Sequence, residues 1–244
     1  MAKHHSQRSA LNARSFPRLV QAGDAAVTVE FGDRIAPAIN GRVRRFAEAV
    51  AAKRWPGILE VVPTFRSATV YYDPLVVPAA TLARRLRALA SWPSRPAPAA
   101  RRRVEVPVCY DEEFGPDLAA LAAAAGLTPT EAAALHRSVE YRVYMLGFTP
   151  GFPYLGSVPA ALAAPRLAEP RLRVPAGSVG IAGEQTGIYP LESPGGWRLI
   201  GRTPLRLYEP ARTPPFLLAP GDVVRFVPID RRTYEELMMG RRRE

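Results

Sequence analysis

The stretch from Glu140 to Trp197 constrains the fold of this chain more than any other part of its sequence. It reads EYRVYMLGFTPGFPYLG, continues through a proline-rich passage, and ends in RLRVPAGSVGIAGEQTGIYPLESPGGW. Glycine, proline and aromatic residues are concentrated here, with isolated charges and amides among them. Tight turns need such glycines and prolines, and turn tips carry many of the polar groups that bind or react. We therefore interpret this stretch as the functional surface of the protein.

Extended segments follow one another beyond Ser138 without helices between them. They are EYRVYMLGF, RVPAGSVGIAG, TGIYPLE, WRLIGRTPLRLYE and VVRFVPI. Short strands at regular spacing, separated by glycine and proline turns, are typical of a closed or nearly closed β-barrel. The polar groups of the turns are then expected to gather at one rim of that barrel.

The segment before these strands is predicted to open the same domain. VEVPVCY indicates a strand with valines on one face, and a short helix should run from Pro116 to Gly126. A second helix should begin at Thr128, because Glu131 follows at the spacing of a capping box and Pro129 occupies the first helical position.

In the region before Trp92, segments with the two-residue hydrophobic period of strands alternate with segments that have the 3.6-residue period of helices. Val27, Val29 and Phe31 recur at the strand period, whereas Val43 and Phe46 belong to a helical pattern. With the strands of ILEVVPTFRSATVYYD and the helix of LARRLRALASW, the order becomes β–β–α–β–β–α. This order favours a small α+β sandwich with its helices on one face of an antiparallel sheet.

These patterns divide the chain into five predicted parts. They are a disordered basic tail (1–15), an α+β domain (16–92), a Pro/Ala/Arg linker (93–103), a β-barrel domain (104–230) and a basic C-terminal tail (231–244).

The formal net charge of +11 over 244 residues lies mostly at the two ends and in the linker. Nucleic-acid grooves interleave basic and aromatic residues across a folded face, and no such pattern is found, so we expect flexible, solvated tails and no nucleic-acid partner. No apolar run approaches the roughly 20 residues that span a bilayer, and no signal-peptide core is present. We therefore expect a cytoplasmic protein without a membrane partner.

Cys109 and His136 are the chain's single cysteine and its one histidine beyond the N-terminal tail. No base at motif spacing would activate Cys109, which favours a small buried hydrophobic residue. His136 is interpreted as a residue of a polar niche or a helix terminus, with a catalytic role kept open. No metal site is expected, because zinc needs several such ligands.

Three motifs carry a resemblance to a known family. They are VEYRVYMLGFTPGFPYLG, RVPAGSVGIAGEQTGIYPLESPGGWRLIGRTPLRLY and PGDVVRFVPI. The chain resembles, from about Arg18 to Asp230, the carboxyltransferase-domain family that includes the B subunit of bacterial 5-oxoprolinase, the first subunit of allophanate hydrolase and the inhibitor of sporulation kinase A. The basic ends depart from the usual family ends.

The resemblance implies a ferredoxin-like N-terminal α/β sandwich, hence an α+β chain, followed by a cyclophilin-like β-barrel. It also implies two partners in 5-oxoprolinase, the larger homologous C subunit, and the separate A subunit. Together the three chains open 5-oxo-L-proline to L-glutamate at the expense of ATP. The alternatives that it leaves are a regulator that inhibits a sensor histidine kinase and a part of a urea carboxylase or allophanate hydrolase system.

Lactam opening through a phosphorylated oxygen needs cations and amide donors around the transferring group. We predict Glu192 as proton acceptor and Gln185 as orienter of the lactam, with Arg173 and Arg202 stabilising negative charge. The predicted phosphate or substrate contacts come from Arg142 and from backbone N–H groups of the turns. They are Arg142, Gly177, Ser178, Gly180, Gly183, Ser193, Gly195 and Gly196.

The predicted pocket or partner aromatics are Phe148, Phe152, Tyr189 and Trp197. Each arginine also fits a surface ion pair, each glycine a barrel corner, and the last two aromatics the filling of the barrel. No G-x-x-x-x-G-K-[ST] loop is present, so ATP, with Mg²⁺, is expected at a site on the partner chain or shared with it.

Overall fold

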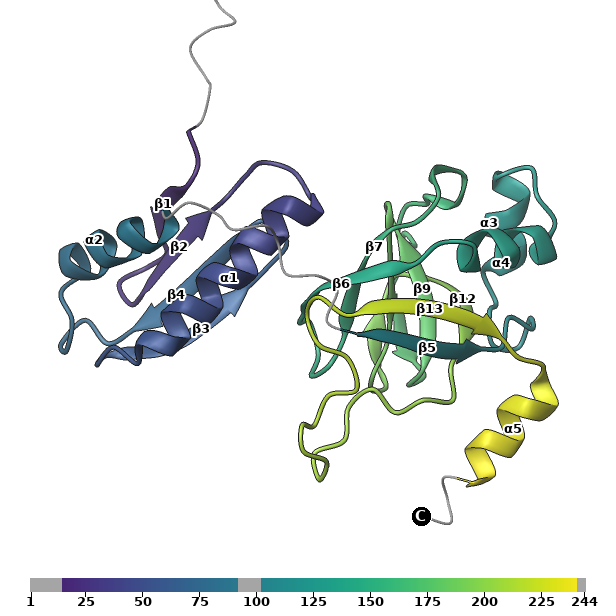
Figure 1. The fold of residues 1–244 in the computed structure, drawn as a ribbon. Helices are drawn as coiled ribbons and strands as arrows, with labels where there is room; N and C mark the ends of the chain where they lie inside the picture. Colours follow the sequence, from purple (N-terminus) through teal and green to yellow (C-terminus); the bar gives the residue numbers. More distant parts are fainter. Residues whose placement is uncertain (1–14, 92–101, 241–244) are drawn as a thin grey trace, which may run out of the picture. The chain divides into compact units, whose positions relative to one another are not determined.

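The structure, a computed structural model, describes residues 15–91 and 102–240 (Figure 1). The chain divides into two compact units, 1–97 and 98–244, and each has its own hydrophobic core. The predicted tail up to residue 14 and the linker from 93 to 101 lie outside the described residues.

The first unit is a four-stranded antiparallel sheet with two helices. In chain order its elements are β1 (Arg18–Gln21), β2 (Ala26–Glu30), α1 (Pro37–Lys53), β3 (Ile58–Pro63), β4 (Ser67–Tyr72) and α2 (Ala79–Ala90). The strands lie in the order β1-β2-β4-β3. Both helices pack on the same face, because their apolar residues share one core with the alternating valines of β2 and β4.

The predicted α+β arrangement of this unit is therefore confirmed, and the apolar residues of both helices are buried, among them Val43, Phe46, Leu82 and Leu86. The ferredoxin-like label is not confirmed. That fold takes its elements in the order β–α–β–β–α–β, whereas this unit takes them in the order β–β–α–β–β–α.

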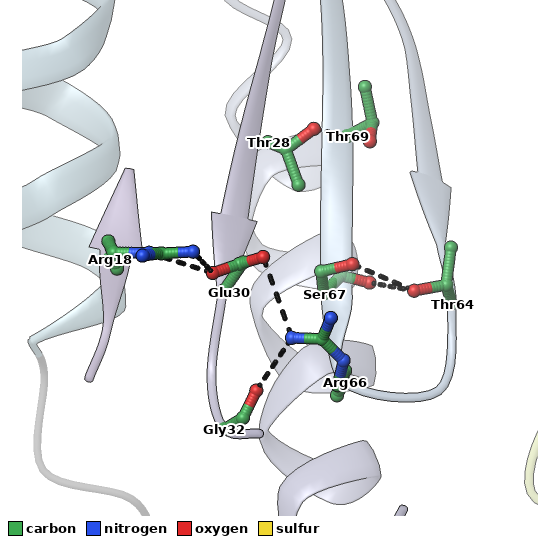
Figure 2. Close-up of polar contacts among 8 residues, drawn as sticks. All are labelled: Arg18, Thr28, Glu30, Gly32, Thr64, Arg66, Ser67 and Thr69. Carbon is green, nitrogen blue, oxygen red and sulfur yellow. Dashed lines mark hydrogen bonds and ion pairs between the residues drawn. The ribbon is translucent and has the colours of Figure 1, made fainter. Parts of the chain in front are cut away.

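The face of this sheet that the helices leave uncovered carries polar contacts between neighbouring strands (Figure 2). The hydroxyl groups of Thr28 and Thr69 are hydrogen-bonded across β2 and β4 at 2.9 Å. Glu30 accepts a 2.8 Å hydrogen bond from Nε of Arg18, and Nη1 of Arg66 lies 3.5 Å from its other oxygen. These pairs satisfy polar groups that are half-buried on an otherwise open sheet.

The second unit contains most of the strands and three α-helices. Its elements are β5 (Arg103–Val108), α3 (Leu118–Ala124), α4 (Pro129–Arg137), β6 (Tyr141–Leu146), β7 (Pro153–Ser157), the 3₁₀ helix η1 (Ala160–Leu162), β8 (Arg171–Val174), β9 (Ser178–Ala182), β10 (Gln185–Ile188), β11 (Ser193–Gly195), β12 (Arg198–Arg202), β13 (Val223–Pro228) and α5 (Arg231–Gly240).

Seven of these strands form one curved sheet in the order β12-β9-β10-β7-β6-β13-β5. Its two edge strands meet where Cys109 and Arg202 exchange backbone hydrogen bonds, each N–H donating to the other C=O at 2.9 Å. The sheet is therefore a nearly closed barrel, as predicted, and it agrees with a cyclophilin-like carboxyltransferase fold. β8 and β11 form a separate two-stranded ribbon.

Apolar side chains from alternate strand positions fill the barrel, among them Val143, Leu155, Ile181 and Phe226. The helices α3 and α4 add their apolar residues to the same core. The predicted capping box starts α4, because the side chain of Thr128 accepts from the N–H of Glu131 while Glu131 accepts from the N–H of Thr128.

No single helix among the described residues is long and apolar enough to cross a membrane, and only α3 and α4, bent by 90° at their junction, reach those limits as a pair.

Two predicted boundaries are wrong. The linker was expected to extend through Arg103, but Arg103 begins β5, and Nε of Arg102 donates a 2.9 Å hydrogen bond to the buried Asp222. Residues 231–244 were expected to be a solvated tail, but residues 231–240 form α5.

Charge pairing explains the second error. Arg231 and Arg232 each donate a 2.8 Å hydrogen bond to the glutamate four residues later, so the charges of this segment support a helix. Tyr234 anchors the helix, since it is buried with its ring 4.4 Å from that of Phe114.

Candidate functional site

The β8–β11 ribbon carries two of the predicted catalytic residues as an ion pair. Nε and Nη2 of Arg173 donate to the two carboxylate oxygens of Glu192 at 2.9 and 3.1 Å. Both side chains are exposed, by 79% and 51%. Arg173 lies on β8 and Glu192 immediately precedes β11, so the pairing of the two strands holds the side chains together. The fork geometry is the one in which a guanidinium recognises a carboxylate.

The glycine turns predicted to cradle phosphate already use their N–H groups within the protein. The N–H of Gly177 donates to the C=O of Tyr189, that of Ser178 to Pro175, and that of Gly183 to Ala164. Gly177 and Gly183 have φ angles of +84° and +57°, which explains the need for glycine at these turns. These two turns are therefore barrel corners and offer no free row of amides to an anion.

Two further glycines make room for aromatic rings. A Cβ at Gly180 would lie 3.0 Å from Cβ of Trp197, and one at Gly195 would lie 2.4 Å from the hydroxyl of Tyr189. Gly196 accepts a hydrogen bond from the N–H of Leu167 through its carbonyl group. The glycines of this stretch thus allow the ribbon and its rings to approach the barrel closely.

The aromatic residues form a cluster on the outer side of the barrel. Phe152, Tyr189 and Trp197 are 5% exposed or less, and the ring of Phe152 lies 5.2 and 5.3 Å from those of the other two. These edge-to-face contacts are typical of packed cores. For these three residues the structure favours packing over an anchor for a partner.

Phe148 differs from them in exposure and in backbone conformation. Its side chain is 63% exposed, and its φ angle of +65° is unusual for a bulky residue. The ring rests edge-on against Phe152 and Tyr189, at centroid distances of 5.6 and 6.4 Å. The turn is closed by the N–H of Gly147, which donates to the C=O of Phe152 at 3.1 Å, and by the N–H of Phe152, which donates to the C=O of Thr149 at 3.0 Å. The protein therefore holds an apolar ring toward solvent at some cost in backbone energy.

The other predicted residues do not gather at one rim, and that expectation is wrong. Gln185 pairs with Ala182 at one end of β9, whereas Arg202 pairs with Ser178 at the other. Four residues along a strand place these ends about 13 Å apart. Strand register thus separates groups that the sequence places within 20 residues of one another.

Three of the remaining candidates, Arg142, Ser178 and Ser193, stay predictions with little structural support. Arg142 lies on β6 opposite Val223 of β13, in a different sheet from the ribbon strands β8 and β11. The hydroxyl groups of Ser178 and Ser193 are buried and have no hydrogen-bond partner. Because these two hydroxyl groups are buried, they are not accessible to a phosphate group in solvent.

His136 lies inside the second unit and is completely buried. Tyr110 lies 3.0 Å from its Nδ1, and Thr186 lies 3.1 Å from its Nε2. Because the hydroxyl of Thr186 donates to the C=O of Gly180, it accepts from Nε2–H, and Nδ1 accepts from Tyr110. Burial lowers the pKa of His136 to about 3, so the ring is neutral at pH 7. The polar-niche interpretation is the one that this geometry supports.

Sequence reasoning did not single out Tyr110, Thr186 or Asp117. Asp117 accepts from the backbone N–H of Leu199 at 2.6 Å and from Nη2 of Arg171 at 2.7 Å, which ties α3 to β12 and to the ribbon. All three residue types are common in loops and strands, so nothing in their local sequence marks them as partners.

Cys109 is buried, and burial raises the pKa of its thiol. The thiol therefore stays protonated and lies against Phe114 and Tyr234, which confirms that it is a small buried hydrophobic residue. Within residues 15–91 and 102–240, no three side chains of His, Cys, Asp or Glu are grouped to hold a metal ion.

A small α+β unit followed by a nearly closed barrel with an outer ribbon defines the class of carboxyltransferase-type domains. The chain belongs to the family described as carboxyltransferase domain, subdomain C and D, whose model matches residues 17–218. It is 44% identical to the B subunit of 5-oxoprolinase from Bacillus subtilis over 89% of this chain and 95% of that protein. It is 47% identical to the B subunit of 5-oxoprolinase from Escherichia coli O157:H7 over 84% of this chain and 93% of that protein.

Among solved structures, the urea amidolyase of K. lactis matches with a TM-score of 0.75 and 22% identity. The match covers 91% of this chain and 15% of that much longer one. At this identity the likeness shows the fold alone.

Proposed function

We propose that this chain is the B subunit of a cytoplasmic, ATP-dependent 5-oxoprolinase, which opens 5-oxo-L-proline to L-glutamate. The observation that carries the proposal is the match to two proteins named as the B subunit of 5-oxoprolinase, each covered over more than nine tenths of its length. The partners are the larger homologous C subunit, which we call the large partner, and the separate A subunit.

The chemistry of the described residues supports a subunit that is inactive alone. Cys109 is buried and protonated, and both ring nitrogens of His136 are engaged inside the barrel domain. Neither residue reaches a substrate in solvent, so no described cysteine or histidine supplies a nucleophile or a general base at the surface. We therefore propose that a second chain completes the site.

The Arg173–Glu192 pair is this chain's proposed contribution to the shared site. It is exposed, held by two hydrogen bonds, and located on a ribbon outside the barrel. We assign to Arg173 the stabilisation of negative charge on the opening lactam, and to Glu192 the acceptance of a proton from the attacking water. Gln185 and Arg202 lie at opposite ends of β9, so we assign them no step at this pair.

The hydrogen bonds of the glycine turns at Gly177, Ser178 and Gly183 support an ATP site away from these turns. Their N–H groups at Gly177, Ser178 and Gly183 donate to carbonyl groups of the protein and are not available to phosphate. ATP would convert the lactam oxygen into a phosphorylated leaving group. We place its site on the large partner or at the contact with it.

Phe148 is the proposed anchor for the large partner. An exposed aromatic ring on a rigid turn is the kind of residue that contributes most to binding when a pocket on another chain covers it. The buried rings of Phe152 and Tyr189 beneath it provide the support. The backbone energy cost of the positive φ angle of Phe148 would be offset when the ring binds the large partner, not when the chain folds.

Reconstitution tests the proposal. The chain alone, its two partners alone and the full set are incubated with 5-oxo-L-proline and ATP, and L-glutamate is measured. We expect glutamate only from the full set, and only with ATP. A parallel set built around the Bacillus subtilis B subunit shows that the assay works. No glutamate from the full set, with a working parallel, would overturn the proposal.

A further inference from the structure

A shallow cavity of about 350 Å³, largely open to solvent, lies between α5 and the end of β12. It is lined by Arg202 of the barrel and by Tyr234, Glu235, Met238 and Met239 of the helix. The proposed function uses neither this cavity nor α5. Its size and mainly apolar lining are those of a site for a small molecule with one or two fixed polar groups.

Arg202 supplies an unpaired cation to this cavity. Its guanidinium lies over the ring of Phe114, with Cζ 5.3 Å from the ring centroid. Nε is buried and has no hydrogen-bond partner, and no described residue forms a hydrogen bond or ion pair with the guanidinium. A planar fork of donors that is held by an aromatic ring and left without an acceptor is suited to a carboxylate.

The acidic residues around the cavity are already paired. Glu235 accepts a 2.8 Å hydrogen bond from Nε of Arg231, and Glu113 lies 2.9 Å from Nη1 of the same arginine. Asp230 accepts from the N–H of Thr233 at the start of α5. Arg231 therefore offsets the charge of both glutamates, and Arg202 is the cationic residue of the cavity lining.

The remaining lining selects for an apolar body. Met238 and Met239 have flexible thioether side chains, which adapt to ligands of different shape, and the ring of Tyr234 forms a wall. Met239 is 59% exposed, so the cavity is open to solvent on its side of the helix. The cation and the apolar wall together match a molecule with a charged end and a short apolar body.

We propose that the cavity between α5 and β12 binds a small monocarboxylate with an apolar body, whose carboxylate is held by Arg202 and whose body lies on Met238 and Met239. The inference rests on the cavity and its residues alone. It stands or fails independently of the proposed function.

Methyl NMR with hexanoate as the probe tests this site. The chain has four methionines, and Met145 on β6 serves as an internal reference for Met238 and Met239. We expect hexanoate to shift the methyl signals of Met238 and Met239 in a saturable way while that of Met145 stays in place. 1-Hexanol, which has the same chain without the charge, should bind at least about tenfold more weakly, as expected for the loss of a charge-assisted hydrogen bond.

Two arginines of β12 provide a matched pair of variants. Arg202→Gln should weaken hexanoate binding by about tenfold or more, whereas Arg198→Gln, at the other end of the strand, should bind as the unmodified chain does. The proposal is overturned if 1-hexanol binds as tightly as hexanoate, if Arg202→Gln binds normally, or if no saturable shift appears. Should Arg202→Gln fail to fold, the comparison of the two probes on the unmodified chain decides alone.

Discussion

The second unit contains two polar clusters of opposite character, one around His136 inside the fold and one at Arg173 and Glu192 on the outer ribbon. The inner cluster is a chain of hydrogen bonds from the half-buried Tyr110 through His136 to Thr186, and the last two are completely buried. The outer cluster is a single exposed ion pair. No sequence motif marks this difference, yet the two clusters have different consequences for stability and for function.

Burial decides those consequences. An unsatisfied polar group in an interior costs about 1–3 kcal/mol, so the inner cluster contributes to stability by having every member paired. An exposed ion pair contributes about 0–1 kcal/mol, so stability gives little reason to place one on the ribbon. We conclude that substitutions in the inner cluster affect folding, and that substitutions in the outer pair affect turnover.

The largest expected effect is on turnover. Glu192→Gln and Arg173→Ala should each lower glutamate formation by the reconstituted enzyme about a hundredfold or more, the usual scale for one acid–base or electrostatic group. Their melting temperatures and their pairing with the large partner should stay unchanged. Steady-state kinetics, thermal unfolding and co-purification measure these three properties.

Glu236→Gln is the control for this prediction, because Glu236 forms a similarly exposed ion pair with Arg232 on α5. It should turn over normally. If Glu192→Gln and Arg173→Ala both fail to pair with the large partner, the ion pair belongs to an interface rather than to the chemistry.

The second prediction concerns the pH dependence of stability. The pKa of His136 is about 3 in the folded chain and ordinarily about 6.5, so the unfolded chain binds a proton in this interval and the folded chain does not. Above pH 6.5 both states are unprotonated at His136, so the free energy of unfolding contains the whole contribution of this residue. It should fall as the pH drops toward 3, by about 1.4 kcal/mol per pH unit.

Denaturant titrations of the unmodified chain and of His136→Leu between pH 4.5 and 7 measure this slope. Above pH 4.5 the titration of carboxylates contributes little to the pH dependence of stability. The unfolding free energy of His136→Leu should therefore change much less with pH than that of the unmodified chain. Equal slopes in both proteins would mean that His136 takes up its proton in the folded state, and that the inner cluster is open to water.

A third prediction distinguishes two effects of Phe148, that of its positive φ angle on stability and that of its ring on association with the large partner. Phe148→Ala and Phe148→Gly both remove the ring and should weaken association with the large partner by about tenfold or more, as expected for an interface anchor. Glycine tolerates the positive φ angle, so Phe148→Gly should be more stable than Phe148→Ala by about 1 kcal/mol. Binding measurements and unfolding of the isolated variants test both parts; normal association of both variants would remove Phe148 from the interface.

The smallest effect is expected at Cys109. Cys109→Ser places a hydroxyl group in a buried apolar site and should cost about 1 kcal/mol of unfolding free energy. Reconstituted activity should stay within a few-fold, because the thiol is buried and burial raises its pKa, so it stays protonated. Complete loss of activity in a folded variant would show that the thiol takes part in the reaction.

Much of the fold was predictable because hydrophobic period and turn residues act locally. The spacing of Val43 and Phe46 predicted α1, the segment LARRLRALASW predicted α2, and the capping box at Thr128 located the start of α4. The nearly closed barrel followed from the spacing of short strands. The helix α5 was missed because the arginines of residues 231–240 were counted as a charged tail, although two of them pair with glutamates one turn away.

The candidate site was less predictable because it depends on register and burial. The pairing of Arg173 with Glu192 requires β8 and β11 to meet, and the separation of Gln185 from Arg202 follows from their partners on β9. Phe148 and Phe152 are four residues apart in one motif, yet one is exposed and the other buried. No local pattern distinguishes the two residues.

A charge-swapped pair tests most directly the claim that the ribbon pair serves the reaction rather than the fold. The double variant Arg173→Glu with Glu192→Arg keeps an ion pair between the same two positions but exchanges its acidic and basic groups. We predict that the reconstituted enzyme carrying it forms glutamate about a hundredfold or more slowly, while it unfolds at the temperature of the unmodified chain and still pairs with the large partner. Normal glutamate formation would contradict the account, because it would show that the pair acts only as a structural link between β8 and β11.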